Sequence, residues 1–563
     1  MLLLAWCVGM YGRGYWTPDE PREADIAWRM SWQADRSVPL LAGEAFCEKP
    51  PLAYWLAAIP VRLFGPHAWA ARLPNVLYAL ITALAVGLLA RRSAGGFAAL
   101  AAAAAASTFL LSYQVAIWLA TDAPLLASVA VALLGAYIGF YATVSRERLR
   151  GYLLMHAALA VGFLSKSAAA WMVPALAIVT LAAWERRWRE LIRWELYAGL
   201  VLQAIIILSW VWWVYVGPDG QEHLKVFFWN NLVGRFTQVD APSELQYAAA
   251  HRNSPGKYLI ELPVYLFPWT LLVIAAARRA WLARKSSFES LRPVRFALSA
   301  SIPPILVLSL AATARNIYLA PALPGFALLL AWWARETLAA RDRWDIRALR
   351  ATAILMLISA AVFIAALIVM AVDARSGLAQ QAGVIVPSAA GLGAAALLAL
   401  RAWSAAPDDP RRAGWSLLLA YCALLVGPAS QAYRQVDHWQ NLGAIARAIG
   451  NDAGSRPVVL FAPDETTRAI IDMYARTNVG LVAGPVDSRA VGRLSAAMAA
   501  APQSLVVAQL PAHAKLRLAS PKSSRPAATQ AAELPWLSSA HLRMFRSYEL
   551  RNGRRYALLE SDR

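Results

Sequence analysis

Two stretches near the start of the chain combine carboxylates with cations. The first, "DEPREADIAWRM", contains Asp19, Glu20 and Arg22, and the second, "FCEKPPLAYWL", contains Glu48 and Lys49. A carboxylate can act as a general base or stabilise developing positive charge, and a cation can bind a phosphate group. This pattern predicts a site for an anionic ligand.

Further chemically capable residues stand beside apolar segments later in the chain. They are Asp122 in "LATDAPLL", Lys166 in "GFLSKSAAAW", Arg235 in "NNLVGRFTQ", His251 in "AAAHRNSPGKY", and Arg315 and Tyr318 in "ATARNIYLAPALP". Ionisable groups at a membrane boundary are costly unless they face a cavity or one another. We therefore expect these side chains to gather at one membrane surface.

Most of these residues also have an ordinary structural explanation. Asp19 and Glu20 can begin a helix, where acidic groups are favoured. Lys49 can be an interfacial anchor whose stem lies along apolar surface. Similar explanations, as surface anchors or a solvated loop residue, apply to Lys166, Arg235 and His251. Asp122 is harder to explain in this way, because a lone carboxylate entering a long apolar run has no ordinary packing role.

The composition predicts a membrane protein with many spans. The chain has 563 residues, of which 59% are hydrophobic and only 16% charged, and a soluble protein of this size needs more charge to cover its surface. Apolar runs of about 20 residues recur, each long enough to cross a bilayer. We expect about thirteen helices, near 1–12, 70–90, 96–114, 123–143, 152–165, 168–184, 196–216, 258–278, 296–312, 317–334, 351–372, 386–404 and 415–432.

The net charge of +20 reflects the orientation of the chain in the membrane and does not indicate a nucleic-acid partner. Arginines collect in every second link between the predicted spans, as in 91–92, 146–150, 186–193, 278–295 and 335–350. Such clusters mark cytoplasmic links. The first loop, 13–69, and the chain after 432 then lie on the opposite side, which is the periplasm in a bacterium.

The two ends of the chain differ from the middle. The first apolar segment is too short to span a bilayer. We expect either that residues precede it in a longer chain or that the start of the protein has been assigned too late in the sequence. A signal peptide is the competing interpretation, but no small-residue cleavage site follows the segment. We expect a transmembrane domain over 1–432. Residues 433–563 mix helical patterns with short β-type runs and predict a soluble α/β domain, with a hairpin around Asn552 and Gly553.

The quoted motifs resemble a known enzyme family. "DEPREADIAWRM" and "EKPPLAYWL" are similar in pattern and order to elements of the integral-membrane C-type glycosyltransferases. The resemblance is to the branch containing the bacterial 4-amino-4-deoxy-L-arabinose lipid A transferases and relatives of the protein O-mannosyltransferases. "TDAPLL", "GFLSKS" and "YLAPALPGFALLL" match later landmarks of that branch. Two departures are Ser167, where glycine is usual, and "PREAD", which lacks the common tyrosine after the arginine.

The resemblance implies transfer of a sugar from a polyprenyl phosphate carrier. The specific expectation is transfer of 4-amino-4-deoxy-L-arabinose from undecaprenyl phosphate to lipid A phosphates, which would confer resistance to polymyxin. We expect Asp19, Asp122 and Glu20 to be catalytic. We expect the donor phosphate to contact Lys49, Arg235 and Arg22, and the substrates to contact Glu48, Lys166, Arg315 and Tyr318.

Several alternatives stay open at this point. No cofactor is required by the pattern, although Glu48 with His251 or Asp19 could ligate a divalent metal ion. An enzyme similar to the protein O-mannosyltransferases would instead modify serine or threonine of secreted proteins. A flippase for the carrier lipid is a third class, but transporters usually place polar sites near the midplane between internal repeats.

Overall fold

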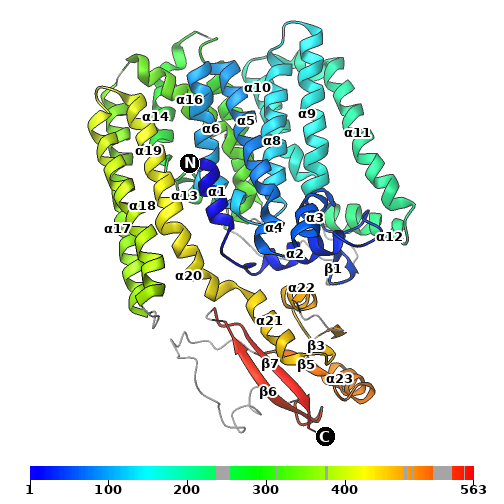
Figure 1. Cartoon of the computed structure of the whole chain (residues 1–563). Helices are drawn as coiled ribbons and strands as arrows, with labels where there is room; N and C mark the ends of the chain where they lie inside the picture. Colours follow the sequence, from blue (N-terminus) through cyan, green and yellow to red (C-terminus); the bar gives the residue numbers. More distant parts are fainter. Residues whose placement is uncertain are drawn as a thin grey trace.

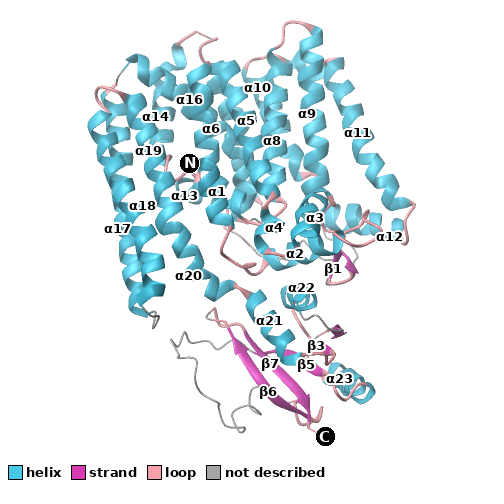
Figure 2. Ribbon diagram, viewed as in Figure 1, coloured by secondary structure: helices cyan, strands magenta, loops and turns pink. Residues whose placement is uncertain are grey.

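The computed structural model describes most of the chain. The described ranges are 1–235, 254–287, 289–311, 315–340, 342–373, 378–474, 479–484, 486–510, 536–550 and 552–562. A bundle of long helices forms the larger part, and a small domain of strands and helices lies beyond one end of it (Figures 1 and 2).

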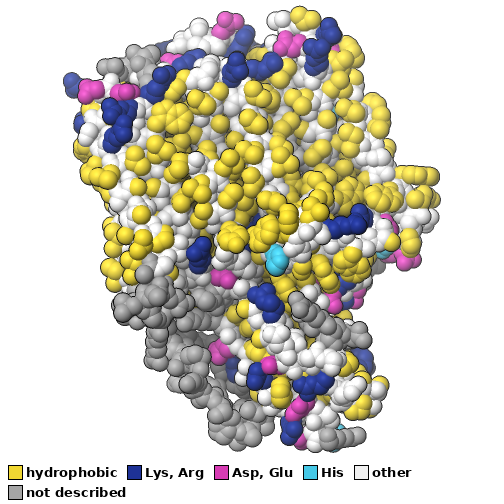
Figure 3. Space-filling view, in the orientation of Figure 1, with side chains coloured by type: hydrophobic (Ala, Val, Ile, Leu, Met, Phe, Trp, Pro, Cys, Tyr) yellow, Lys and Arg dark blue, Asp and Glu magenta, His cyan; other side chains and the backbone are white. Residues whose placement is uncertain are grey.

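Long apolar helices make up the bundle because their sequences are hydrophobic on most sides. They are α5 (Pro74–Ala94), α8 (Asp122–Tyr141), α9 (Ser145–Lys166), α10 (Ala169–Trp184), α11 (Trp194–Tyr215), α15 (Arg292–Leu310), α16 (Leu323–Ala340), α17 (Arg343–Asp373), α18 (Leu378–Ala405) and α19 (Pro410–Leu424). Large apolar side chains on the outer surface, such as Leu84, Ile205 and Val362, are more than half exposed. A broad apolar band therefore covers the face of the bundle seen in Figure 3, as in a multi-pass membrane protein.

The number of full spans differs from the expected thirteen. Among the described residues, eight helical segments are long and apolar enough to cross a membrane, or up to ten if two bent pairs are counted. The first pair is α6 (Gly96–Thr108) with α7 (Leu110–Ile117), bent by 65°, and the second is α13 (Lys257–Tyr265) with the helix that follows it, α14 (Thr270–Leu282), bent by 111°. A further predicted span is only the nine-residue α1 (Leu2–Met10).

Small residues allow close contact between neighbouring helices. A Cβ atom on Gly151 of α9 would lie 2.4 Å from the backbone nitrogen of Gly139 of α8. In the alanine-rich α6, Ala98 and Ala102 are completely buried. Small side chains of this kind let neighbouring membrane helices approach closely.

Many arginines in the predicted cytoplasmic links pair with acidic residues. Arg148 contacts Glu195 at 3.3 Å and Arg295 contacts Glu185 at 2.7 Å. At the end of the bundle away from the small domain, charged side chains border the apolar band (Figure 3). The links therefore help to hold neighbouring helices together as well as marking one membrane surface.

Short elements cover the opposite end of the bundle (Figure 1). They are α2 (Asp19–Met30), α3 (Leu52–Phe64), α4 (Ala68–Arg72), α12 (Gly220–Lys225), the strands β1 (Leu40–Leu41) and β2 (Glu44–Ala45), and the 3-10 helix η7 (Asn316–Ala322). The prolines of "EKPPLAYW" immediately precede α3, with Pro51 as its N-cap residue. Proline suits a helix start because its missing N–H has no intrahelical partner there.

The chain leaves the bundle through α20 (Ser430–Gln440) and enters the small domain. That domain contains α21 (Leu442–Ala453), α22 (Glu465–Tyr474), α23 (Ser488–Ala500) and the strands β3 (Val458–Phe461), β4 (Val479–Val482), β5 (Leu505–Leu510), β6 (Leu542–Glu549) and β7 (Arg555–Ser561). The sheet order is β4-β3-β5-β7-β6. Strands β3, β4 and β5 are parallel, while β6 and β7 form the antiparallel hairpin predicted around Asn552 and Gly553. The boundary at 432/433 stays a prediction.

Candidate active site at one end of the helix bundle

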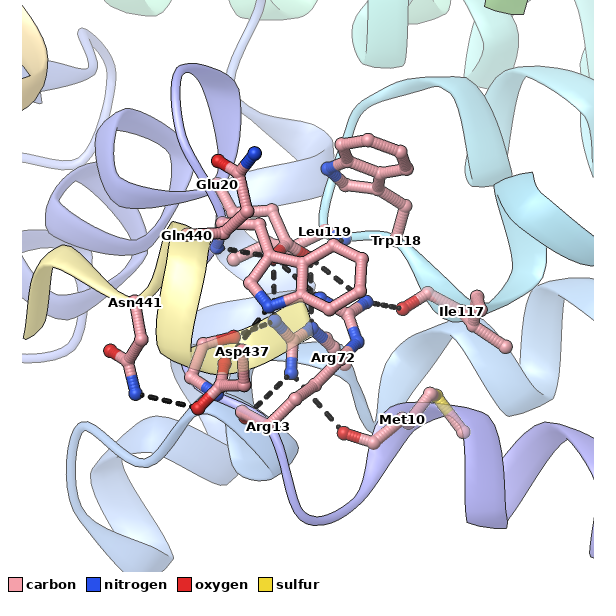
Figure 4. A network of polar contacts seen from close by, with 12 residues as sticks. Met10, Arg13, Glu20, Arg72, Ile117, Trp118, Leu119, Asp437, Gln440 and Asn441 are labelled. Carbon is pink, nitrogen blue, oxygen red and sulfur yellow. Dashed lines mark hydrogen bonds and ion pairs between the residues drawn. The ribbon is translucent and has the colours of Figure 1, made fainter. Parts of the chain in front are cut away.

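A buried carboxylate, Glu20, fastens the start of α2 to the bundle (Figure 4). Its oxygen Oε2 lies 2.8 Å from Arg13 and 2.6 Å from Arg72, and its side chain has no exposed surface. The backbone N–H of Leu119, which precedes α8, donates to Oε1 at 2.9 Å. The interior position of Glu20 is thus stabilised by two cations and by hydrogen bonds.

A second acid, Asp437 of α20, holds the segment before α2 from the other side (Figure 4). Its Oδ1 accepts hydrogen bonds from the backbone N–H of Gly14 at 2.7 Å and from the indole of Trp16 at 2.9 Å. Asn441 donates to its Oδ2 at 2.8 Å. The start of α2 is therefore held between the bundle and the helix that leads to the small domain.

Glu20 was predicted to be catalytic, and its surroundings point instead to a positioning role. Burial alone would raise the pKa of Glu20, but Arg13 and Arg72 outweigh that effect and lower the pKa to about 2. Such a carboxylate does not take up a proton near neutral pH. The sequence analysis missed Arg13 and Arg72. Both arginines stand beside apolar segments, and this position could have indicated that they pair with a buried acid.

Lys49, in the loop before α3, pairs with Glu23 of α2. Its ammonium contacts Glu23 Oε1, and the Glu23 side chain is only 7% exposed. Burial opposes the charge of Lys49, but the neighbouring Glu23 carboxylate more than offsets this, so the pKa of Lys49 is raised. Lys49 therefore stays cationic at neutral pH. Glu23 follows Arg22, at the position where the resembled branch commonly has tyrosine.

Arg22 lies between two acidic residues from different parts of the chain. Its Nε is 2.9 Å from Glu465 of α22, and its Nη2 is 3.8 Å from Glu48. Glu23 and Glu48 also act electrostatically on both Arg22 and Lys49. The structure thus brings the two predicted motifs together in one group of alternating charges.

A second group of charges joins five more of the predicted residues. Arg315 contacts Asp19 at 2.6 Å, and Lys166 contacts Asp122 at 2.5 Å. The ammonium of Lys166 also lies 4.5 Å from the centre of the Tyr318 ring. Residues separated by almost 300 positions therefore meet at the start of α2, as the sequence predicted.

Ser167 shows why glycine is usual at its position. It ends α9 directly after Lys166 with a φ of 59° and a ψ of −155°. Only glycine adopts this conformation without strain, because it has no Cβ atom. The backbone turn that presents Lys166 is retained here in spite of the serine.

The remaining predicted residues are only partly described. Arg235 ends a 3-10 turn at Val233–Arg235, and its side chain lies outside the described part, as does the whole of His251. Within the described residues, no group of three or more His, Cys, Asp or Glu could hold a metal ion. The metal site suggested for Glu48 and His251 stays a prediction.

The arrangement suits transfer of a group carried on a lipid phosphate. Two cation–carboxylate groups lie at this end of the bundle, one around Lys49 and one around Lys166; the two lysines are partly exposed and their partner carboxylates are buried. Cations there can bind a phosphate leaving group, and carboxylates can stabilise a sugar that develops positive charge.

Comparison with known proteins relates the chain to transferases of this kind. The family described as dolichyl-phosphate-mannose-protein mannosyltransferase matches residues 48–213. The undecaprenyl phosphate-alpha-4-amino-4-deoxy-L-arabinose arabinosyl transferase of Pectobacterium carotovorum subsp. carotovorum (strain PC1) is 31% identical over 341 residues. That match spans 59% of this chain and 57% of the relative. The protein of the same name from Pseudomonas paraeruginosa (strain DSM 24068 / PA7) is 28% identical over 80% of each chain.

Solved structures extend the likeness to the whole chain. ArnT from Cupriavidus metallidurans in the apo state has a TM-score of 0.70 and covers 100% of this chain. The same protein bound to undecaprenyl phosphate has a TM-score of 0.71 and covers 99%. In both cases 96% of the solved chain is matched, at 20% sequence identity.

This chain has the same overall fold as ArnT from Cupriavidus metallidurans. The family resemblance expected from "DEPREADIAWRM" and "EKPPLAYWL" is confirmed by these relatives. The fold class of a polytopic helical membrane protein is confirmed as well. The roles of individual residues in this transferase fold stay predictions.

Proposed function

We propose that the protein transfers 4-amino-4-deoxy-L-arabinose from undecaprenyl phosphate to phosphate groups of lipid A. The observation that carries the proposal is the gathering of Lys49, Arg22, Asp19 and Asp122 at one end of the membrane bundle. The named relatives support this choice of donor, because they are described as transferases acting from an undecaprenyl phosphate-aminoarabinose.

Lys49 is the proposed ligand of the donor phosphate. An ammonium has three N–H donors, so Lys49 can hold Glu23 and a phosphate oxygen together. Arg22 and Arg235 are proposed to add positive charge, and Lys166, Arg315 and Tyr318 to contact the substrates. Negative charge grows on the phosphate as the glycosidic bond breaks, and a fixed cation stabilises it there.

Asp19 and Asp122 are proposed to act on the sugar and acceptor side. The anomeric carbon acquires positive character in the transition state, which a nearby carboxylate stabilises. A lipid A phosphate is already ionised at neutral pH and can attack without a general base. In this reaction Asp19 therefore acts by electrostatics and positioning, and the expected outcome is inversion at the anomeric carbon.

The proposed site faces the periplasm at the inner membrane of a bacterium. The arginine-rich links lie at the opposite end of the bundle and are proposed to be cytoplasmic. The product would carry an added amine, which lowers the negative charge of the envelope. We expect this change to give resistance to cationic antimicrobial peptides such as polymyxin.

The test is lipid A mass spectrometry in a host that makes the aminoarabinose donor but lacks its own transferase. The native protein should add the mass of a pentosamine to lipid A. Asp19→Asn and Lys49→Ala should lower the modified fraction by about 100-fold or more, as expected when one transition-state contact is lost. Arg92→Ala is the matched control, because Arg92 forms an exposed pair with Glu147 in the opposite membrane half.

Unmodified lipid A, with the native protein folded and the donor present, would contradict the proposal. The second candidate is then transfer to serine or threonine of secreted proteins, which the mannosyltransferase family match favours. Sugar on periplasmic proteins would identify that activity, and Asp19 would then serve as a general base. Donor crossing the membrane undiminished in Asp19→Asn, without any transfer, would indicate a flippase.

A further inference from the structure

A small cavity with both polar and apolar lining residues lies beside the Lys49–Glu23 pair. It has a volume of about 20 Å³ and is lined by residues of α2, α3, α5 and the segment that begins α8. The polar lining residues are Glu23, Tyr54, Asn75 and Tyr78, and Pro124 of α8 follows Asp122 by two positions. The cavity therefore lies between elements that carry both charge groups of the candidate active site.

The lining side chains are buried and incompletely paired. Tyr54 is 2% exposed and Tyr78 is 7% exposed. Among the described residues, the Tyr78 hydroxyl has no hydrogen-bond partner, whereas the Tyr54 hydroxyl interacts with the Glu23 carboxylate. A buried hydroxyl without a partner costs free energy, so native structures rarely retain one without a reason. The Tyr78 hydroxyl is therefore available to a group that enters the cavity, and the Tyr54 oxygen can still accept a hydrogen bond from that group.

Glu23 is the acidic residue in the cavity lining and makes the electrostatic potential there more negative. Its carboxylate is bound to Lys49 and acts electrostatically on Tyr54. Phenol oxygens and carboxylate oxygens all accept hydrogen bonds. Acceptors that surround a small space favour an ammonium group, which has three donors and a positive charge. The volume suits one such group and is too small for a sugar ring.

We propose that this cavity is the subsite for the amino substituent of the donor sugar. The inference rests on the proposed function, because it places the charged end of an aminosugar whose phosphate contacts Lys49. Glu23 then lies between two cations, the Lys49 ammonium and the sugar ammonium, and reduces the repulsion between them. Tyr54 and Tyr78 accept hydrogen bonds from the sugar ammonium and distinguish it from a neutral group.

The experiment compares two donors with purified full-length protein in lipid vesicles that contain lipid A. One donor is undecaprenyl phosphate carrying 4-amino-4-deoxy-L-arabinose, and the other carries arabinose, in which a hydroxyl replaces the amine. The measured quantity is the ratio of kcat/KM for the two donors. General damage to the protein lowers both values, whereas loss of the subsite changes their ratio.

Two variants test the lining residues. Glu23→Gln should lower the preference for the amino donor by about tenfold or more, because the charge is lost while the shape is kept. Tyr78→Phe should lower it severalfold and should leave thermal stability unchanged, since only an unpaired hydroxyl is removed. Tyr421→Phe is the control, because Tyr421 is a buried tyrosine on α19 whose hydroxyl also lacks a partner.

The outcomes separate this inference from the proposed function. An unchanged ratio in both variants, with the native protein active, would mean that the cavity holds only water and would overturn the inference alone. Equal use of both donors by the native protein would do the same. No transfer from either donor would overturn the proposed function and this inference with it.

Discussion

At the scale of single residues, the candidate site contains two kinds of charged side chain. Glu20 has no exposed surface and is bound by Arg13 and Arg72, whereas Asp19, one position earlier, is 31% exposed and pairs with Arg315. We therefore propose different roles for these adjacent acids. The buried acid is held at the start of α2 by two arginines, and the partly exposed acid is the one proposed to meet a substrate.

Replacing Glu20 should damage stability first. Glu20→Gln leaves Arg13 and Arg72 close together in the interior without an opposing charge, and breaking a buried ion pair in this way costs about 3 to 5 kcal/mol. We expect a clearly lower midpoint of thermal unfolding in detergent. Glu147→Gln, which removes only the exposed pair with Arg92, should change it little. Equal midpoints for the two variants would contradict the positioning role of Glu20.

At the scale of elements, α2 is the centre of the site because it touches so many other parts. Its first turn contacts α4 and the segment before α8, and its length packs against α3 and α22. Ile26 and Met30 of α2 are buried together with Ala469 of α22. The orientation of Asp19, Arg22 and Glu23 therefore depends on packing on several sides of one short helix.

Asp25 makes the packing of α2 sensitive to pH. Burial raises its pKa from 3.8 to about 6, against the opposing effects of Arg29, the backbone N–H of Ala42 and Arg468. The folded protein therefore binds a proton on Asp25 more readily than the unfolded chain does. The contribution of Asp25 to the free energy of unfolding is therefore most favourable below pH 4. It is lost as the pH rises through about 6, which lowers the free energy of unfolding by about 3 kcal/mol.

Comparison with Asp25→Asn isolates this contribution. The difference in free energy of unfolding, native protein minus variant, should fall as the pH rises from 4 to 7. Chemical unfolding followed at several pH values measures it. A difference that stays constant, or that grows with pH, would show that Asp25 keeps an ordinary or lowered pKa in the folded protein.

At the scale of the whole molecule, the small domain is joined to the candidate site by ion pairs. Arg22 contacts Glu465, Arg29 contacts Asp472, and Arg468 contacts Glu44 at 2.9 Å. Two hydrogen bonds add to these, from Thr466 to the carbonyl of Pro18 and from Tyr474 to that of Pro66. The small domain therefore contacts the helix that carries Asp19, one of the proposed catalytic residues.

Removing two of these ion pairs should loosen α2. In the double variant Glu465→Gln, Asp472→Asn, each lost pair is worth about 1 kcal/mol at a partly exposed surface. Backbone amides of α2 should then exchange hydrogen at least about fivefold faster, measured by mass spectrometry. Glu560→Gln removes a pair with Arg543 inside the small domain and is the control. Equal exchange in both proteins would show that apolar packing alone holds α2.

The sequence by itself determined the fold class and the identity of most candidate residues. Apolar length and charge placement are local properties, so the bundle and the hairpin at Asn552 and Gly553 could be predicted, and the motif spacing indicated the transferase family. Only the tertiary structure decided which charges meet. Glu20 became interior because Arg13 and Arg72 converge on it, and Glu23 became the partner of Lys49. Such pairings depend on helix packing between distant segments, and burial then determines whether a carboxylate holds the fold or serves the reaction.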